Sequence, residues 1–209
     1  MTKTVSIVTA LALGYGLLAA PANAAESAYT DVNLDACTTI AEEPEQESFV
    51  SLKCPGYGSY PFYFKEGDLR QAVFFGHLDQ RILDEAFESF GPFNHIGGKI
   101  EWRLGSDGKP FATILRYFIE NANPDSGVPD KAHEGQVLVI SRVGQPGDMR
   151  GCVVGYVDAR ANPKANVLAR EIADEKAASF GCGWFKPVFY GAKSESSGEP
   201  MLNFPALDD

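Results

Sequence analysis

Basic residues are scarce in this sequence. Its 209 residues include 18 Lys and Arg against 28 Asp and Glu, which gives a formal net charge of −10. This balance argues against nucleic acids and anionic membrane surfaces as partners, because both would repel the average surface of the protein. A cationic partner is compatible with the charge. So is the simpler interpretation that acidity keeps the protein soluble.

Long apolar runs are absent except at the N-terminus. The apolar stretch from about Val5 to Ala20 follows Lys3, is interrupted by glycines, and is shorter than the roughly 20 residues that cross a bilayer. Small residues then lead to Ala24. This pattern predicts a secretory signal peptide, residues 1–24, and a periplasmic protein. The mature chain, residues 25–209, would carry a net charge of −11, because the leader contains one lysine and no acid.

Cysteine is also scarce, and no two cysteines form a C-x-x-C pair or a spacing with histidine that is typical of zinc sites. All four lie after the leader, and an even number in an oxidising compartment predicts two disulfides, with three possible connectivities. We expect the sequential pairing, Cys37–Cys54 and Cys152–Cys182. Each local loop would stabilise the fold by about 3 kcal/mol or slightly more. The alternative is a reactive thiol, since "GCGW" around Cys182 is similar to a cysteine-protease nucleophile segment whose flanking pattern is missing.

Motifs for catalysis and cofactor binding are missing as well. The three histidines, His77, His95 and His133, form no H-x-H or H-E-x-x-H arrangement. There is no G-x-S-x-G turn, and "GSDGK" is too short for a phosphate-binding loop. The sequence therefore predicts no metal and no cofactor. A hydrolase would need acids that only the fold brings together, with Asp158, Asp68 and Glu101 as candidates.

Asp158 ends the apolar run "CVVGYVD" and precedes a predicted helix. Active-site acids are often found at such a strand end. An aspartate at this place also accepts backbone N–H bonds and interacts with a helix N-terminus. We favour the structural role, because no histidine or second acid is near in sequence and a lowered pKa does not suit a general base.

Short segments typical of strands alternate with turn residues along most of the chain. Two hairpins flank "PGYGS" and "GSDGK", and a third joins residues 136–143 to residues 152–158. Residues 69–76 predict a further strand, whereas residues 26–47 are acidic and loosely patterned.

Two segments have helical spacing. In residues 78–91 apolar side chains recur at intervals of four, and in residues 164–180 they form one stripe between Asn162, a natural N-cap, and Gly181, a natural end. We expect an α+β fold: an antiparallel meandering sheet of about six to seven strands with the C-terminal helix packed on one face. Residues 25–190 would form a single domain, followed by a weakly ordered tail, residues 191–209.

One polar cluster and one set of aromatic residues are candidates for ligand binding. Glu101 and Arg103 share a face of one strand, with Arg116 on the facing strand. They predict either a solvated ion-pair group or a patch that binds an anion or carboxylate. The aromatic residues next to glycine or proline are either core or a protein- or glycan-facing surface; they are Tyr57, Tyr60, Phe62, Phe93 and Trp184.

Three segments, "CPGYGSYPFYFKEGDLR", "FGPFN" and "CVVGYVDARANPKANVLAREIADEKAASFGC", resemble small exported bacterial proteins of unassigned function. The resemblance implies a periplasmic, disulfide-bonded single domain and no particular site residues. We expect a non-enzymatic domain that binds a protein or cell-envelope ligand, for example a cationic hydrolase such as lysozyme. The alternatives are a small hydrolase and a structural component of the envelope.

Overall fold

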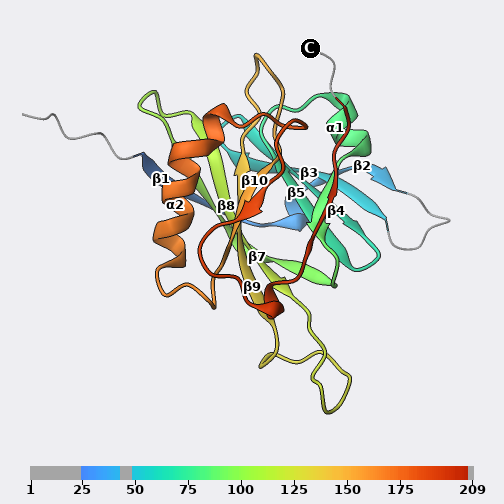
Figure 1. Ribbon diagram of the computed structural model, residues 1–209. Helices are drawn as coiled ribbons and strands as arrows, with labels where there is room; N and C mark the ends of the chain where they lie inside the picture. The colour runs from blue at the N-terminus through green and yellow to red at the C-terminus, as the bar shows by residue number, and fades with distance from the viewer. Residues whose placement is uncertain (1–24, 43–48, 207–209) are drawn as a thin grey trace, which may run out of the picture.

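Twelve strands and two α-helices form the part of the chain that the computed structural model describes, residues 25–42 and 49–206, and strand is the commonest secondary structure (Figure 1). The predicted signal peptide and most of the acidic "EEPEQE" segment lie outside these residues. The largest sheet has six strands in the order β1-β7-β8-β9-β10-β11. Their bounds are Glu26–Asp31, Asn94–Leu104, Pro110–Ile119, Gly135–Arg142, Val153–Asp158 and Val188–Phe189. This sheet is mixed, because β11 runs parallel to β10 and the other pairs are antiparallel.

A four-stranded antiparallel sheet has the order β2-β3-β4-β5, with bounds Thr38–Glu42, Val50–Tyr57, Tyr60–Gly67 and Arg70–Phe75. A third sheet pairs β6, Phe87–Phe90, with β12, Pro200–Asn203. The α-helices are α1, Gln80–Glu85, and α2, Ala165–Lys176. Short 3-10 turns occupy Leu34–Ala36, Ala177–Ser179 and Glu195–Ser197.

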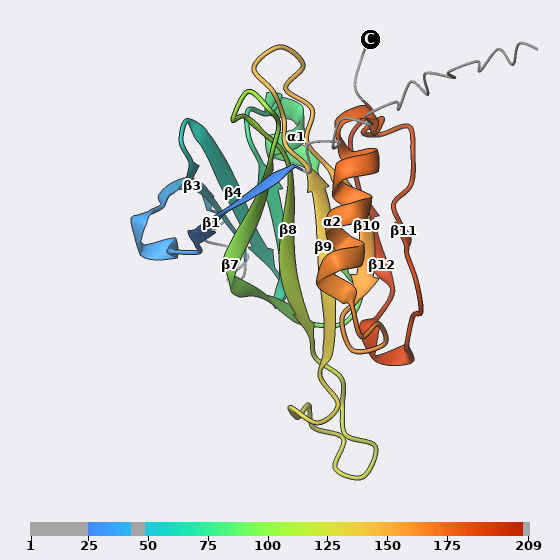
Figure 2. The same ribbon diagram turned by 90° about the vertical axis from the view of Figure 1, so that its left-hand side faces the viewer.

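The six-stranded sheet is covered on both faces (Figure 2). Ile100, Trp102 and Leu104 of β7 point toward the four-stranded sheet and join the main core. The residues between them point toward α2, which packs on a second apolar cluster that includes Ile114 and Ile140. Apolar and charged side chains alternate along this part of β7, and the alternation separates two buried faces, not a core face and a solvent face.

The structure confirms the α+β class, the C-terminal helix on one sheet face and the disulfide pairing. Cys37 bonds to Cys54, and Cys152 bonds to Cys182. The second disulfide joins the start of β10 to the segment after α2. No cysteine is free.

Two expectations about local structure were wrong. The helix expected over residues 78–91 ends at Glu85, and residues 87–90 form β6 because they find a strand partner in β12. The same pairing places an ordered strand within the expected tail, residues 191–209. Residues 26–42, for which the sequence predicted no particular element, contain β1 and β2, which pair with β7 and β3. β1, β6 and β12 form because each has a partner distant in sequence, whereas β2 pairs with the next strand along the chain.

None of the helices in residues 25–42 and 49–206 combines the length and the apolar character that crossing a membrane requires.

Candidate functional site

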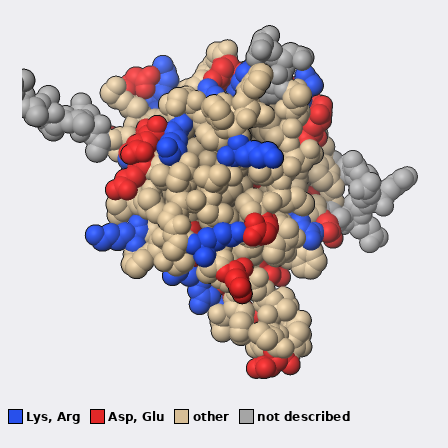
Figure 3. Space-filling view, viewed as in Figure 1, with Lys and Arg blue, Asp and Glu red and all other residues tan. Residues whose placement is uncertain are grey.

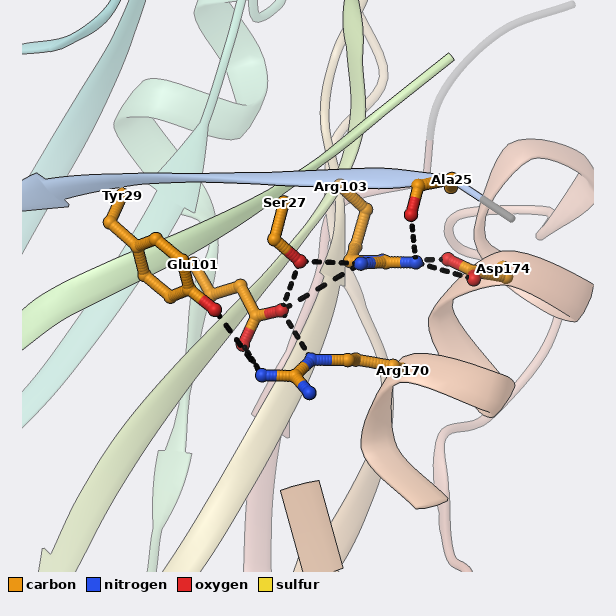
Figure 4. Close-up of polar contacts among 7 residues, drawn as sticks. All are labelled: Ala25, Ser27, Tyr29, Glu101, Arg103, Arg170 and Asp174. Carbon is orange, nitrogen blue, oxygen red and sulfur yellow. Dashed lines mark hydrogen bonds and ion pairs between the residues drawn. The ribbon is translucent and has the colours of Figure 1, made fainter. Parts of the chain in front are cut away.

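The predicted polar cluster is an interior network between β1, β7 and α2 (Figure 4). The Arg103 side chain donates from Nε and Nη2 to the two carboxylate oxygens of Asp174, at 2.8 and 2.6 Å. It also donates to the carbonyl oxygen of Ala25, at 2.7 Å, and to the hydroxyl of Ser27. Both Glu101 and Arg103 are buried. Arginine has five N–H donors, and these contacts occupy most of them, so little hydrogen-bonding capacity is left for a ligand.

The second arginine of the network is Arg170 of α2, not Arg116. Arg170 Nε lies 2.6 Å from Glu101 Oε1, and its Nη2 lies 3.2 Å from Oε2. Arg116 lies on the same sheet face but donates to Gln136 Oε1 at 3.0 Å. The expectation that Glu101, Arg103 and Arg116 form one group was therefore wrong for Arg116. Its replacement comes from a helix that lies far away in sequence.

The charge of Glu101 is stabilised inside this network. Burial acts to raise the pKa of its carboxyl, but hydrogen bonds from Arg170 and Ser27, together with the charges of Arg170 and Arg103, outweigh burial and lower it. The same pair raises the pKa of Arg170. The network thus joins the helix to the sheet by fixed charges, and its chemistry is that of a structural clamp.

Asp158 fastens the end of β10 to two other segments. Its Oδ1 accepts from the backbone N–H groups of Arg160 and Ala161, at 2.8 and 2.9 Å, and its Oδ2 accepts from the Ser194 N–H at 2.8 Å and from the Ser194 hydroxyl. Burial acts to raise the pKa of Asp158, but these hydrogen bonds lower it overall. All its contacts are internal, and they match the structural role that the sequence favours.

The histidines and the third candidate acid lie apart. His77 packs edge-on against the Tyr60 ring, His95 stacks on Phe118, and the His133 Nδ1 lies 2.7 Å from Asp130. Asp68 is exposed and pairs with Arg70. Within the described residues, no group of three or more His, Cys, Asp or Glu side chains is placed to hold a metal ion.

The most exposed large aromatic side chains of the described residues lie on the turn that follows α2. Trp184 is 67% exposed and Phe185 is 62% exposed. The N–H groups of both residues donate to the Gly181 carbonyl oxygen at 3.0 Å, and the disulfide of buried Cys182 holds the turn to the body. We call residues 181–185 the aromatic turn. Sequence analysis singled out Trp184 but not Phe185, whose signal was only its position next to Trp184.

The other four aromatic residues considered from the sequence contribute less exposed surface. Tyr60 and Phe62 belong to the main core, and Tyr57 packs against it. Phe93 is partly exposed and lies under the Arg70 guanidinium. The aromatic turn is therefore the part of this set that is most accessible to a partner.

Charge is dispersed on the face where β11 and the C-terminal segment lie. Figure 3 shows basic and acidic side chains interspersed around a middle that is largely uncharged. The loop between β8 and β9 projects from the body in Figures 1 and 2. It is rich in acidic residues. Residues 120–134, which we call the acidic loop, contain Glu120, Asp125, Asp130 and Glu134 against Lys131.

The acidic loop is organised by its own polar groups. The Asn123 N–H donates to the Val128 carbonyl at 2.9 Å, and the Asn123 side chain donates to Asp130 Oδ2 at 2.7 Å. Hydrogen bonds from the His133 side chain and from Asn123 lower the pKa of Asp130 to about 2. The loop thus keeps both its shape and its negative charge at neutral pH.

Comparison with known proteins finds no matching family model, no matching curated protein and no matching solved structure.

Proposed function

We propose that this chain is an exported, periplasmic, non-enzymatic domain that binds a protein ligand through the aromatic turn. The observation that carries the proposal is the exposure of Trp184 and Phe185 side by side on a short turn. Large aromatic side chains are normally buried on folding, and Trp is the residue most enriched among the anchors of protein interfaces. Leaving two of them in water is costly unless a partner covers them.

The backbone of the aromatic turn is held before any partner arrives. Its base is fixed by the Cys152–Cys182 disulfide and by the two hydrogen bonds to Gly181. Gly183 has φ +82, a conformation that glycine adopts without strain. A rigid anchor loses little conformational entropy on binding, so most of its apolar burial contributes to affinity.

Export is supported by the leader pattern in residues 1–24 and by two disulfides, which persist in oxidising compartments. A cationic partner is supported by the net charge and by the acidic loop, because a fixed negative field speeds the approach of a positively charged protein. A cationic hydrolase such as lysozyme fits this description.

The hydrolase alternative is less well supported by the described residues. Asp158 and Glu101 are occupied by separate internal partners, and the pKa of each carboxyl is lowered, whereas a general acid needs a raised one. Asp68 pairs with Arg70 in the solvent. None of the three shares a partner with a histidine.

The decisive experiment is site-specific photo-crosslinking in the exporting cell. Phe185 is replaced by p-benzoylphenylalanine, a close analogue of phenylalanine, and the matched control carries the same group at Val167, an exposed position on α2. We expect a discrete crosslinked protein from position 185 and none from position 167. A crosslink only to cell-wall glycan would favour the structural envelope component, and equal labelling from both positions would contradict an anchor at the turn.

A second measurement tests the cationic partner directly. Purified residues 25–209 are titrated against a cationic lysozyme at low and at physiological ionic strength, with Trp184→Ala as the comparison. We expect binding that weakens with salt and that falls at least tenfold in Trp184→Ala. Binding that is independent of Trp184 would show that charge alone, and not the aromatic turn, makes the contact.

A further inference from the structure

A cavity of about 370 Å³ lies on the outer side of the four-stranded sheet, near the turn between β3 and β4. Thr38, Lys53 and Tyr63 line it from three neighbouring strands, and they are directly opposite one another in the strand register. Residues 54–56, 58–59 and 61, together with Ala36 and His77, complete the wall. Its volume is in the range of small-molecule sites.

The backbone around this cavity has little freedom to collapse into it. The Cys37–Cys54 disulfide ties the segment before β2 to β3. The register shifts between Cys54 and Tyr57, and a Cβ atom at Gly56 would lie 2.3 Å from the Tyr60 carbonyl oxygen. The bulge is therefore a close backbone contact that requires glycine, and it fixes the shape of the wall.

Three hydrogen-bond donors on the cavity lining are unused. Within residues 25–42 and 49–206, the Lys53 ammonium, the His77 ring nitrogens and the Tyr63 hydroxyl make no hydrogen bond or ion pair. The Lys53 Nζ lies 6.0 Å from the centroid of the Tyr63 ring. Burial raises the pKa of Tyr63, so its hydroxyl stays a donor at neutral pH.

The lining contains no Asp or Glu, although the protein as a whole is strongly acidic. A cavity of about 250 Å³ between the β7–β8 turn and the end of α2 provides the contrast. There, Lys109 is paired with Asp107 at 3.0 Å, and Arg142 donates to the Phe180 carbonyl and to Asp148. The basic groups of that cavity already have partners, whereas those beside Tyr63 do not.

We propose that the cavity beside Lys53 binds a small organic anion. Lys53 provides the charge for a carboxylate or phosphate group, and His77 and the Tyr63 hydroxyl donate to its oxygens. The organic part of the ligand lies against the Tyr63 ring and the prolines of the wall. This site is separate from the aromatic turn, so it does not depend on the protein-binding role.

The test is calorimetric titration of the disulfide-bonded chain, residues 25–209, with citrate, glycerol 3-phosphate and inorganic phosphate at constant ionic strength, and with glycerol as a neutral probe. We expect citrate or glycerol 3-phosphate to bind with a Kd below about 1 mM and glycerol not to bind. Inorganic phosphate that binds as tightly as both organic probes would overturn the role assigned to the organic part of the ligand.

The decisive comparison is Lys53→Met against Lys109→Met, which removes the paired lysine of the other cavity. We expect at least a tenfold loss of affinity in Lys53→Met and less than a twofold change in Lys109→Met. Because Lys53 is exposed, the variant should keep its melting temperature, and His77→Gln provides a second variant with an expected loss of three- to tenfold. Equal affinities in wild type and Lys53→Met would refute the site. So would the absence of binding heat with every anion at concentrations up to about 10 mM, because a ligand with a Kd of about 1 mM would be mostly bound there.

Discussion

Arg170 of α2 and Glu101 of β7, which are 69 residues apart, form a two-point ion pair with N–O distances of 2.6 and 3.2 Å. One turn further along the helix the polarity is reversed, because Asp174 of α2 accepts from Arg103 of β7. An acid–base pair and a base–acid pair thus lie side by side on the same two elements. Sliding or turning the helix would place like charges opposite one another, so the two pairs specify one position of α2 on the sheet.

We expect Arg170→Met to destabilise the fold by roughly 2 kcal/mol, because it leaves the buried Glu101 carboxylate with fewer partners. The figure is below that for a fully buried pair, since the Arg170 side chain is 38% exposed and solvent screens part of the interaction. Urea unfolding measures the change. The matched control is Arg116→Met, which breaks only a hydrogen bond to Gln136 and should cost about 1 kcal/mol or less. Equal costs for the two variants would contradict the clamp.

Asp158→Ala should destabilise the protein by about 3 kcal/mol, because it leaves three part-buried backbone donors without their acceptor. The folded-state pKa of Asp158 is lowered, so its ionised form contributes stability above the unfolded-state pKa of about 4, and that stability is lost as the pH falls below it. Melting temperatures measured from about pH 2 to about pH 6, roughly two units on either side of the unfolded-state pKa, report this loss. Asp158→Asn should flatten the acid side of the curve. A variant with unchanged stability but no ligand binding would instead assign Asp158 to a functional site.

Local patterns predicted most of the fold. The hairpin pattern around "GSDGK" located β7 and β8, and the apolar stripe with its glycine end located α2. What could not be predicted were elements whose partner lies far away along the chain. Phe87–Phe90 has helical spacing with the residues before it, and only β12, more than a hundred residues later, makes it a strand.

The candidate site shows the same division. The sequence located Glu101 and Arg103 on one face of a strand, but it gave no means to see that α2 covers this face and provides Arg170. Arg116, which was expected to join Glu101 and Arg103, lies on the same face of the neighbouring strand but donates a hydrogen bond to Gln136 instead. The sequence also did not reveal which aromatic side chains are exposed. Phe62 and Trp184 each follow a proline or a glycine, yet Phe62 is buried in the core and Trp184 is exposed. Tertiary packing decides that difference.

Glu88 should make the protein less stable as the pH rises from about 4.5 to about 8. Burial raises the pKa of its carboxyl to about 8, and the hydrogen bond from the Val153 N–H opposes this only in part. The folded state therefore holds a proton that the unfolded state has released, and stability falls by up to about 1.4 kcal/mol per pH unit in that interval. Glu88→Gln keeps an acceptor for Val153 and should remove this slope, as melting temperatures measured across the interval would reveal. A steeper decline in the variant would contradict the assignment.

Removing the Cys152–Cys182 disulfide should separate the stability of the fold from the rigidity of the aromatic turn. The bond spans 30 residues, and on the loop-entropy model the double variant Cys152→Ser, Cys182→Ser loses about 3.5 kcal/mol. The Cys37→Ser, Cys54→Ser variant is the matched control, because its shorter span of 17 residues predicts a similar loss of about 3 kcal/mol. Both variants are compared well below their melting temperatures, where each is folded. If the turn is a preorganised anchor, only the first should lose affinity for the partner crosslinked at position 185. It should also show faster hydrogen exchange at residues 181–185. A parallel loss of affinity in both variants would mean that the disulfides act only through global stability and that the turn needs no support of its own.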